Sequence, residues 1–146
     1  MRKNLDAYLV RKYPLLYKAR HKHMTETCMC WGFDVGNGWY QLIKRLSAKL
    51  EKMIQATPIE EQEHYYAQQV KEKYGSLRLY MLSSTDEMER AIEEAEKESA
   101  VTCEKCGRPG KLIEGGMKWL MTRCDVCISK MRRRGDPVRI LKIRRT

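Results

Sequence analysis

Apolar side chains recur at intervals of three and four residues in three stretches of the chain, which is typical of helices with one buried face. The first stretch, 4–19, is interrupted by Pro14, and the second covers 39–54. The third starts after Ser84 or Thr85, either of which can cap a helix, and runs to about residue 100. Its outer face is strongly acidic, with Glu89, Glu93, Glu94, Glu96 and Glu98.

Two shorter stretches, 65–71 and 77–82, predict strands joined by a turn at Tyr74, Gly75 and Ser76. A second tight turn is expected at 36–38, where the sequence reads Gly-Asn-Gly. The sequence therefore predicts an α+β fold, in which helices pack on a small antiparallel hairpin or sheet.

Cysteines carry the clearest chemical signal in the chain. Cys103 and Cys106 form one C-x-x-C pair, Cys124 and Cys127 form another, and 17 residues separate the two pairs. Gly107 follows the first pair, where a glycine lets the backbone turn back tightly. Thiolates at this spacing can surround one tetrahedral Zn²⁺.

The residues between the two pairs predict two short strands around Gly115 and Gly116, and the second pair opens a run that reads as a helix. A knuckle, a hairpin and a helix that carries the last ligands is the layout of a treble-clef zinc module. We expect one structural Zn²⁺ on Cys103, Cys106, Cys124 and Cys127. Four free thiols or two disulfides are the alternatives.

Composition favours a globular protein, because 33% of residues are charged and 42% are hydrophobic. No apolar run is long enough to cross a membrane, and the first residues do not resemble a signal peptide. We therefore expect a reducing cytoplasm, where metal binding is favoured over disulfides. Three parts are predicted: an α+β body over 1–100, the zinc module over 101–130, and a basic tail over 131–146.

Positive charge is concentrated at the two ends of the chain. The net charge is +10, but residues 1–24 contribute +6 and residues 130–146 contribute +7, so that the middle is mildly acidic. This asymmetry favours an anionic partner. The expected contact residues are Arg132, Arg133, Arg134, Arg139, Lys142, Arg144 and Arg145. Alternating apolar residues at 138–143 indicate that the last segment docks as a strand or short helix.

Three ordered segments resemble a known family: 28–43 (CMCWGFDVGNGWYQLI), 69–80 (QVKEKYGSLRLY) and 95–107 (AEKESAVTCEKCG). The chain resembles a widespread group of small proteins of tailed phages and prophages over roughly residues 28–128. Asn37 stands where that pattern usually has Asp, and Tyr74 where it usually has Phe. The resemblance implies a viral or prophage source and a bacterial host cytoplasm. It brings no established activity, so no catalytic residue is transferred.

Other chemistry-bearing residues have plainer alternatives. Cys28 and Cys30, with His21 and His23 upstream, are candidates for a second metal site or are simply thiols and loop histidines. Asp34 and Glu72 are the best carboxylates for a metal-dependent nuclease. However, no histidine lies in the cysteine module, and four cysteines would fill the coordination sphere of zinc.

Aromatic residues offer a further binding hypothesis. The predicted hairpin combines tyrosines with cations, namely Tyr65, Tyr66, Tyr74, Tyr80, Lys71, Lys73 and Arg78. Single-stranded nucleic acid favours such surfaces, although a hairpin packed on a helix with solvated lysines is the favoured interpretation. Trp39 is expected as a core anchor and Trp119 as a cover for the zinc hairpin.

These observations predict a non-enzymatic accessory protein that acts by binding. Nucleic acid, bound through the basic tail and the zinc module, is the first hypothesis for the partner. An inhibitor or modulator of a host defence or transcription complex is the second, with the acidic helix or the basic ends as its contact surface. A metal-dependent nuclease is the third.

Overall fold

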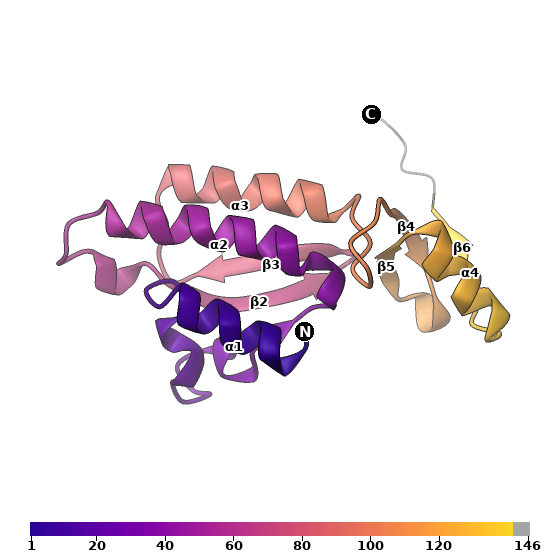
Figure 1. The fold of residues 1–146 in the computed structure, drawn as a ribbon, viewed down its shortest axis with the longest axis horizontal. Coiled ribbons are helices and arrows are strands. Elements are labelled where there is room, and N and C mark those ends of the chain that lie inside the picture. The colour runs from indigo at the N-terminus through magenta and orange to yellow at the C-terminus, as the bar shows by residue number, and fades with distance from the viewer. Residues whose placement is uncertain (142–146) are drawn as a thin grey trace.

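The computed structural model describes residues 1–141. Within that range the chain forms an α+β fold with four α-helices and two three-stranded sheets (Figure 1). The helices are α1 (Lys3–Lys12), α2 (Tyr40–Gln55), α3 (Asp86–Ser99) and α4 (Asp125–Arg133). The strands are β1 (Phe33–Asp34), β2 (Ala67–Lys73), β3 (Ser76–Met81), β4 (Lys111–Glu114), β5 (Leu120–Arg123) and β6 (Arg139–Ile140).

The first sheet has the order β1-β2-β3, and its main component is the predicted hairpin. β2 and β3 run antiparallel and are joined by the two residues Tyr74 and Gly75. β1 pairs with β2 in parallel through only two residues, Phe33 and Asp34. Such a short strand carries no periodicity, which is why the sequence pattern did not predict it.

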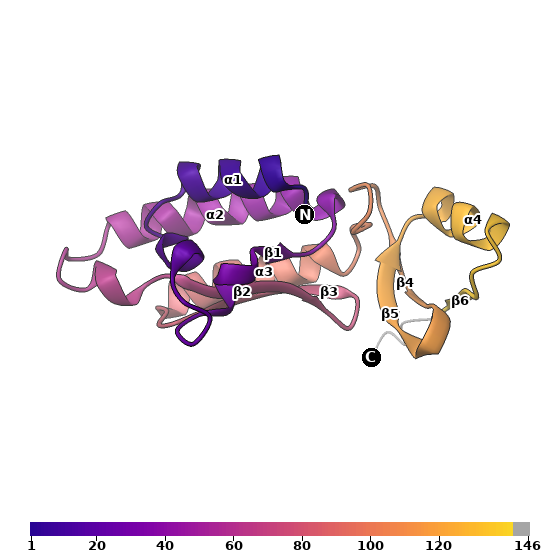
Figure 2. The same cartoon turned by 90° about the horizontal axis from the view of Figure 1, so that it is seen from below.

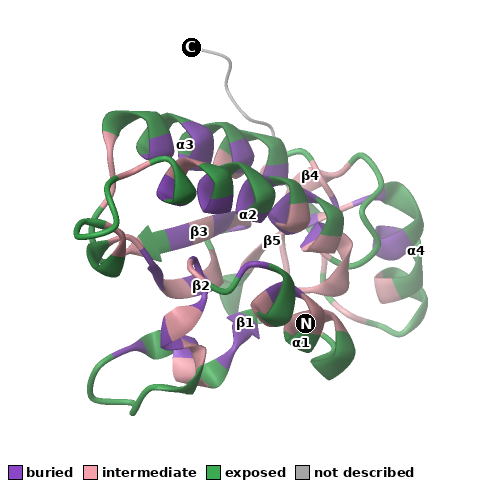
Figure 3. Cartoon of the chain, turned by 60° about the vertical axis from the view of Figure 1, so that its left-hand side comes forward, coloured by how far each residue is buried: buried purple, intermediate pink, exposed green. Residues whose placement is uncertain are grey.

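α2 and α3 lie side by side over the hairpin, and their apolar faces meet it to form the core. Figure 3 shows the buried faces of both helices turned toward the strands and the exposed faces turned outward. The buried side chains include Leu42, Ile43, Leu46, Leu50, Ile54, Val70, Leu77, Leu79, Met88 and Ile92. The predicted helices at 39–54 and after Thr85 are confirmed, and the Thr85 hydroxyl accepts a hydrogen bond from the Met88 N–H as its cap.

The first predicted helix is shorter than the apolar pattern indicates. α1 ends at Lys12, and the chain then turns and forms a short 3₁₀ helix at Lys18–His21. Pro14 explains the break, since proline cannot donate to the helix and disfavours helical backbone in the preceding residue. Leu16 and Tyr17 still enter the core, because Glu51 of α2 accepts hydrogen bonds from the N–H groups of Leu15 and Leu16.

The second sheet belongs to the cysteine module and has the order β5-β4-β6. β4 and β5 form the predicted hairpin, and β6 pairs antiparallel with the other edge of β4, with Ile140 opposite Ile113. The expectation that the last segment docks is confirmed for 139–140 as a strand. Leu141 continues this edge by donating its N–H to the carbonyl of Leu112, and residues 142 and 143 of that prediction lie outside the described residues.

The two sheets meet where the tip of the β2–β3 hairpin points at β5 (Figure 2). There the Thr122 hydroxyl donates a buried hydrogen bond of 2.6 Å to the carbonyl of Gly75. None of the helices in residues 1–141 has the length and apolar character that crossing a membrane requires.

Candidate metal centre

Four cysteines converge at the base of the C-terminal module. The Sγ atoms of Cys103, Cys106, Cys124 and Cys127 all lie within 4.8 Å of one another. Cys106 Sγ is 3.5 Å from Cys124 Sγ and 3.7 Å from Cys127 Sγ. A regular tetrahedron with Zn–S bonds of about 2.3 Å has sulfur atoms about 3.8 Å apart. The thiols are free, and these separations are far longer than a disulfide bond. The cluster could therefore hold a metal ion.

The first pair sits on a tight backbone knuckle. Gly107 has a φ of +79° and donates its N–H to the carbonyl of Cys103 at 2.8 Å, while the Cys103 N–H donates to the carbonyl of Arg108 at 2.7 Å. This positive φ is strained for residues with a side chain, so the expected role of Gly107 is confirmed.

The second pair is positioned by the start of α4. Cys124 is the residue that precedes the helix, and Cys127 lies in its first turn. The carbonyl of Cys124 accepts the N–H of Ile128, a buried residue that anchors the helix. Knuckle, β4–β5 hairpin and helix together have the predicted treble-clef-like layout.

Without a cation, thiols this close together do not all ionise together, and one thiolate is favoured at the expense of its neighbours. Burial and the neighbouring thiols raise the pKa of Cys127 to about 12, and burial raises the pKa of Cys106. Burial also opposes ionisation of Cys124, but the backbone N–H of Cys127 and the surrounding thiols donate hydrogen bonds that lower its pKa to about 7. A bound cation would favour all four thiolates at once, so this set of donors fits a soft or borderline metal.

The knuckle is held against the body by Glu104, which lies between the first two cysteines. Its carboxylate accepts a hydrogen bond from Gly36 at 2.9 Å and pairs with Arg123 at 2.8 Å, and its carbonyl accepts the N–H of Gly38 at 2.7 Å. Gly38 approaches so closely that a Cβ would collide with the backbone of Cys103. The sequence predicts only a turn at 36–38, although two glycines around Asn37 are a signal of close backbone contact.

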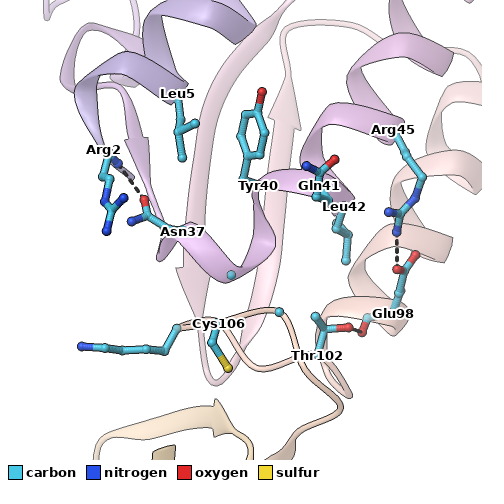
Figure 4. Close-up of a pocket in the computed structure, with 13 residues that line it drawn as sticks. Arg2, Leu5, Asn37, Tyr40, Gln41, Leu42, Arg45, Glu98, Thr102 and Cys106 are labelled. Atoms are coloured by element: carbon cyan, nitrogen blue, oxygen red, sulfur yellow. Dashed lines mark hydrogen bonds and ion pairs between the residues drawn. The ribbon is translucent and has the colours of Figure 1, made fainter.

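A pocket of about 510 Å³ opens where this knuckle meets the body (Figure 4). Arg2, Asn37 and Lys105 line one part of it, and Asn37 accepts the backbone N–H of Arg2. Arg45 and Glu98, on α2 and α3, form an ion pair in its wall. The pocket marks the seam between the body and the module.

The expected contact residues divide into three groups. Arg132 and Arg133 are exposed at the end of α4. Arg134 pairs with Asp136 at 2.9 Å, and Arg139 of β6 lies 3.9 Å from Glu114. Lys142, Arg144 and Arg145 lie outside the described residues.

The other candidate ligands do not come together. Within residues 1–141, the four cysteines are the one group of three or more metal-ligating side chains that lie close enough for an ion. The Cys30 thiol donates a hydrogen bond to the Thr27 carbonyl, and the Nδ1 atom of His23 forms a hydrogen bond with the Thr25 hydroxyl. Glu72 accepts the N–H of Gly75 at 2.6 Å, and burial raises its pKa.

The tryptophans have different environments. Trp39 is fully buried, as expected of a core anchor, and its indole N–H donates to the Thr102 carbonyl. Trp31 is 71% exposed. Trp119 was expected to cover the zinc hairpin, but it is 61% exposed and stands at the rim of a cleft with Tyr74. It follows a loop and precedes β5, so its position is set by the loop backbone and not by strand alternation.

Comparisons with protein-family models, with curated proteins and with solved structures find no match to this chain.

Proposed function

We propose that this chain is a non-enzymatic accessory protein of a tailed phage or prophage, acting in the host cytoplasm, which binds nucleic acid through a basic helix fixed by one structural Zn²⁺. The observation that carries the proposal is the position of the cysteine cluster at the base of α4. Cys124 and Cys127 hold the start of that helix, and Arg132 and Arg133 project from its last turn. A metal at the cluster would fix the start of α4 and so the position of these two arginines at its end.

Zinc is the metal that four thiolates in a compact tetrahedral arrangement favour most, with iron as the competitor. Four protein ligands leave no open position for water or substrate, so the metal serves folding and not catalysis. Small metal modules of this size draw much of their folding free energy from the ion. Within residues 1–141, neither Asp34 nor Glu72 belongs to a group of three ligating side chains close enough to hold an ion, which makes the nuclease hypothesis the weakest.

Phosphate contacts from the α4 arginines would give affinity with little sequence specificity and a strong salt dependence. The second hypothesis, a modulator of a host protein complex, would use the acidic face of α3 or the same basic ends. That face is largely neutralised within the chain, because Glu94 pairs with Lys49, Glu98 with Arg45 and Glu93 with Lys97. The basic end of α4 is thus the better candidate for a contact surface.

Point substitutions test this better than truncation, because removal of 130–146 would also delete β6 from the edge of β4. Arg132→Ala with Arg133→Ala should weaken binding to duplex and to single strands and reduce the slope of log affinity against log salt by about 1.4 to 1.8. Arg90→Ala with Lys97→Ala, on exposed positions of α3, removes the same charge as a control. Equal effects from both pairs would contradict a role for α4. Stoichiometric recovery of one host protein after nuclease treatment would favour the second hypothesis.

A further inference from the structure

A cleft of about 370 Å³ lies between the turn of the β2–β3 hairpin and the loop that joins β4 to β5. One wall comes from the body and the other from the cysteine module. Its rim carries three large side chains that are mostly in solvent: Tyr74 is 70% exposed, Trp119 61% and Met117 fully. Lys71, Lys73 and Lys118 also line it, and Glu72 is the single acidic residue among its lining residues.

The backbone at this cleft is unusual. Tyr74, Met117 and Lys118 have φ values of 55°, 52° and 59°, and they are the only non-glycine residues with positive φ in residues 1–141. All three line the same cleft. Residues other than glycine rarely adopt this backbone conformation. Where they do, the surrounding structure holds them in it, most often at functional sites.

Tyr74 is also an unfavourable residue for its turn. Tyr74 and Gly75 both have positive φ and form the two-residue connection between β2 and β3, as in a type I′ turn. The first position of such a turn prefers Asn, Asp or Gly. A tyrosine there gains little from burial, because it is 70% exposed.

Contacts on both sides keep the turn rigid. The Thr122 hydroxyl donates to the Gly75 carbonyl, and the Glu72 carboxylate accepts the Gly75 N–H. A Cβ on Gly75 would collide with Leu112 of β4, so the turn fits closely against the module. Tyr74 is therefore held in place opposite the loop that carries Trp119, and this arrangement depends on the same β4–β5 hairpin that joins the two cysteine pairs.

Exposed aromatic rings among cations match the chemistry of an unpaired nucleotide strand. Bases stack on aromatic faces, and phosphates pair with lysines. Three lysines against one carboxylate give the cleft a positive balance, and Lys73 Nζ lies 5.5 Å from the centre of the Tyr74 ring. A duplex cannot offer the faces of its stacked bases, so the rings discriminate in favour of single strands.

We propose that this cleft is a base-stacking site for single-stranded nucleic acid, with Tyr74 and Trp119 as the stacking residues and Lys71, Lys73 and Lys118 as phosphate contacts. This inference rests on the proposed function and adds to it, because α4 supplies contacts that any nucleic acid can use whereas the cleft selects unpaired bases.

Fluorescence anisotropy of a labelled oligothymidine and of a labelled duplex, measured with the full chain at one salt concentration, tests it. Tyr74→Asn is the most informative variant, since Asn-Gly is the preferred sequence for this turn. We expect its melting temperature to rise while its affinity for the oligothymidine falls about 5- to 100-fold. Trp119→Ala should cause a similar loss, and duplex affinity should change less than about twofold in both variants. Trp31→Ala, at a similarly exposed tryptophan outside the cleft, is the control.

Each outcome separates this inference from the proposed function. If both cleft variants bind the oligothymidine as the wild type does, the cleft inference is wrong, and a protein partner becomes the better occupant. Equal losses for strand and duplex also overturn it. If the cleft variants lose single-strand affinity but the α4 variant does not, the inference stands and the role of α4 fails. A wild-type protein that binds neither probe overturns both.

Discussion

The indole N–H of Trp39 donates a hydrogen bond of 2.7 Å to the carbonyl of Thr102. Trp39 precedes α2 in the body, and Thr102 immediately precedes the first cysteine of the cluster. The core and the candidate metal centre are thereby joined through a fully buried side chain.

Trp39→Phe keeps most of the ring in the core and removes the indole donor. We expect the free energy of unfolding to fall by about 1 kcal/mol or somewhat more, because the hydrogen bond is lost and the ring is smaller. Urea denaturation followed by circular dichroism measures this change. Trp31→Phe, on the exposed surface, should leave the free energy within about 0.5 kcal/mol of the wild type.

Substitution of one cysteine tests whether the cluster binds a metal and which parts of the fold depend on it. Native mass spectrometry should find one Zn²⁺ per chain in the wild type and none in Cys124→Ser or after chelation. In a hydrogen-exchange experiment, the backbone amides of this variant should be less protected than those of the wild type over 101–130. The same loss is expected at Gly36, Gly38 and the 74–76 turn, which contact the module. The middle of α2 should stay protected, since its partners are in the body core. Uniform loss of protection along the whole chain would contradict this division, and a metal-free wild type would contradict the zinc proposal itself.

Substitution of Gly38, with Gly116 as the control, tests how closely the knuckle packs on the body. A Cβ at Gly38 would collide with the backbone of Cys103 and Cys106, whereas a Cβ at Gly116 would make an ordinary contact with Pro137. Gly38→Ala should therefore cost about 1–3 kcal/mol of stability, as other forced insertions into packed sites do. Gly116→Ala should be close to neutral. Similar melting temperatures for both variants would show that the knuckle does not pack on Gly38 as described.

Glu51 is a charged residue with only 6% of its surface exposed. Its carboxylate accepts the N–H groups of Leu15 and Leu16 at 3.1 and 2.8 Å, which fixes the chain after α1 onto α2. Glu51→Ala should lower the free energy of unfolding by about 3 kcal/mol, since two backbone donors lose a charged acceptor. Glu60→Ala, at an exposed position in the connector, is the control and should change it little. Chemical denaturation of both variants compares them directly.

Glu72 should make stability depend on pH. Burial raises its pKa in the folded protein above the ordinary value of 4.5, so the folded state holds this proton more tightly than the unfolded state. The contribution of this carboxyl to the free energy of unfolding therefore decreases as pH rises from 4.5 through the folded-state pKa. Relative to Glu72→Gln, the wild type should lose stability across that window. If the free energies of unfolding of the wild type and of Glu72→Gln differ by the same amount at every pH, the raised pKa of Glu72 is contradicted.

Several features could be predicted from the sequence because each depends on local pattern. The spacing of Leu42, Leu46 and Leu50 predicts the buried face of α2 wherever that helix packs. The two cysteine pairs and Gly107 predict the knuckle, since ligand spacing and a positive φ are properties of a few consecutive residues. Thr85 likewise caps α3 through its own neighbour at Met88.

Tertiary structure alone decided which of these local pieces touch. Glu104 accepts from Gly36 and Gly38, and Thr122 donates to Gly75, across 47 to 68 residues of chain. Such contacts leave no periodic trace, because they depend on how the body and the module dock. The same docking places Tyr74 opposite Trp119, so that two aromatic residues from separate hairpins share one cleft. The sequence determined the longer helices, the two hairpins and the ligand set, and long-range packing determined the surface they form.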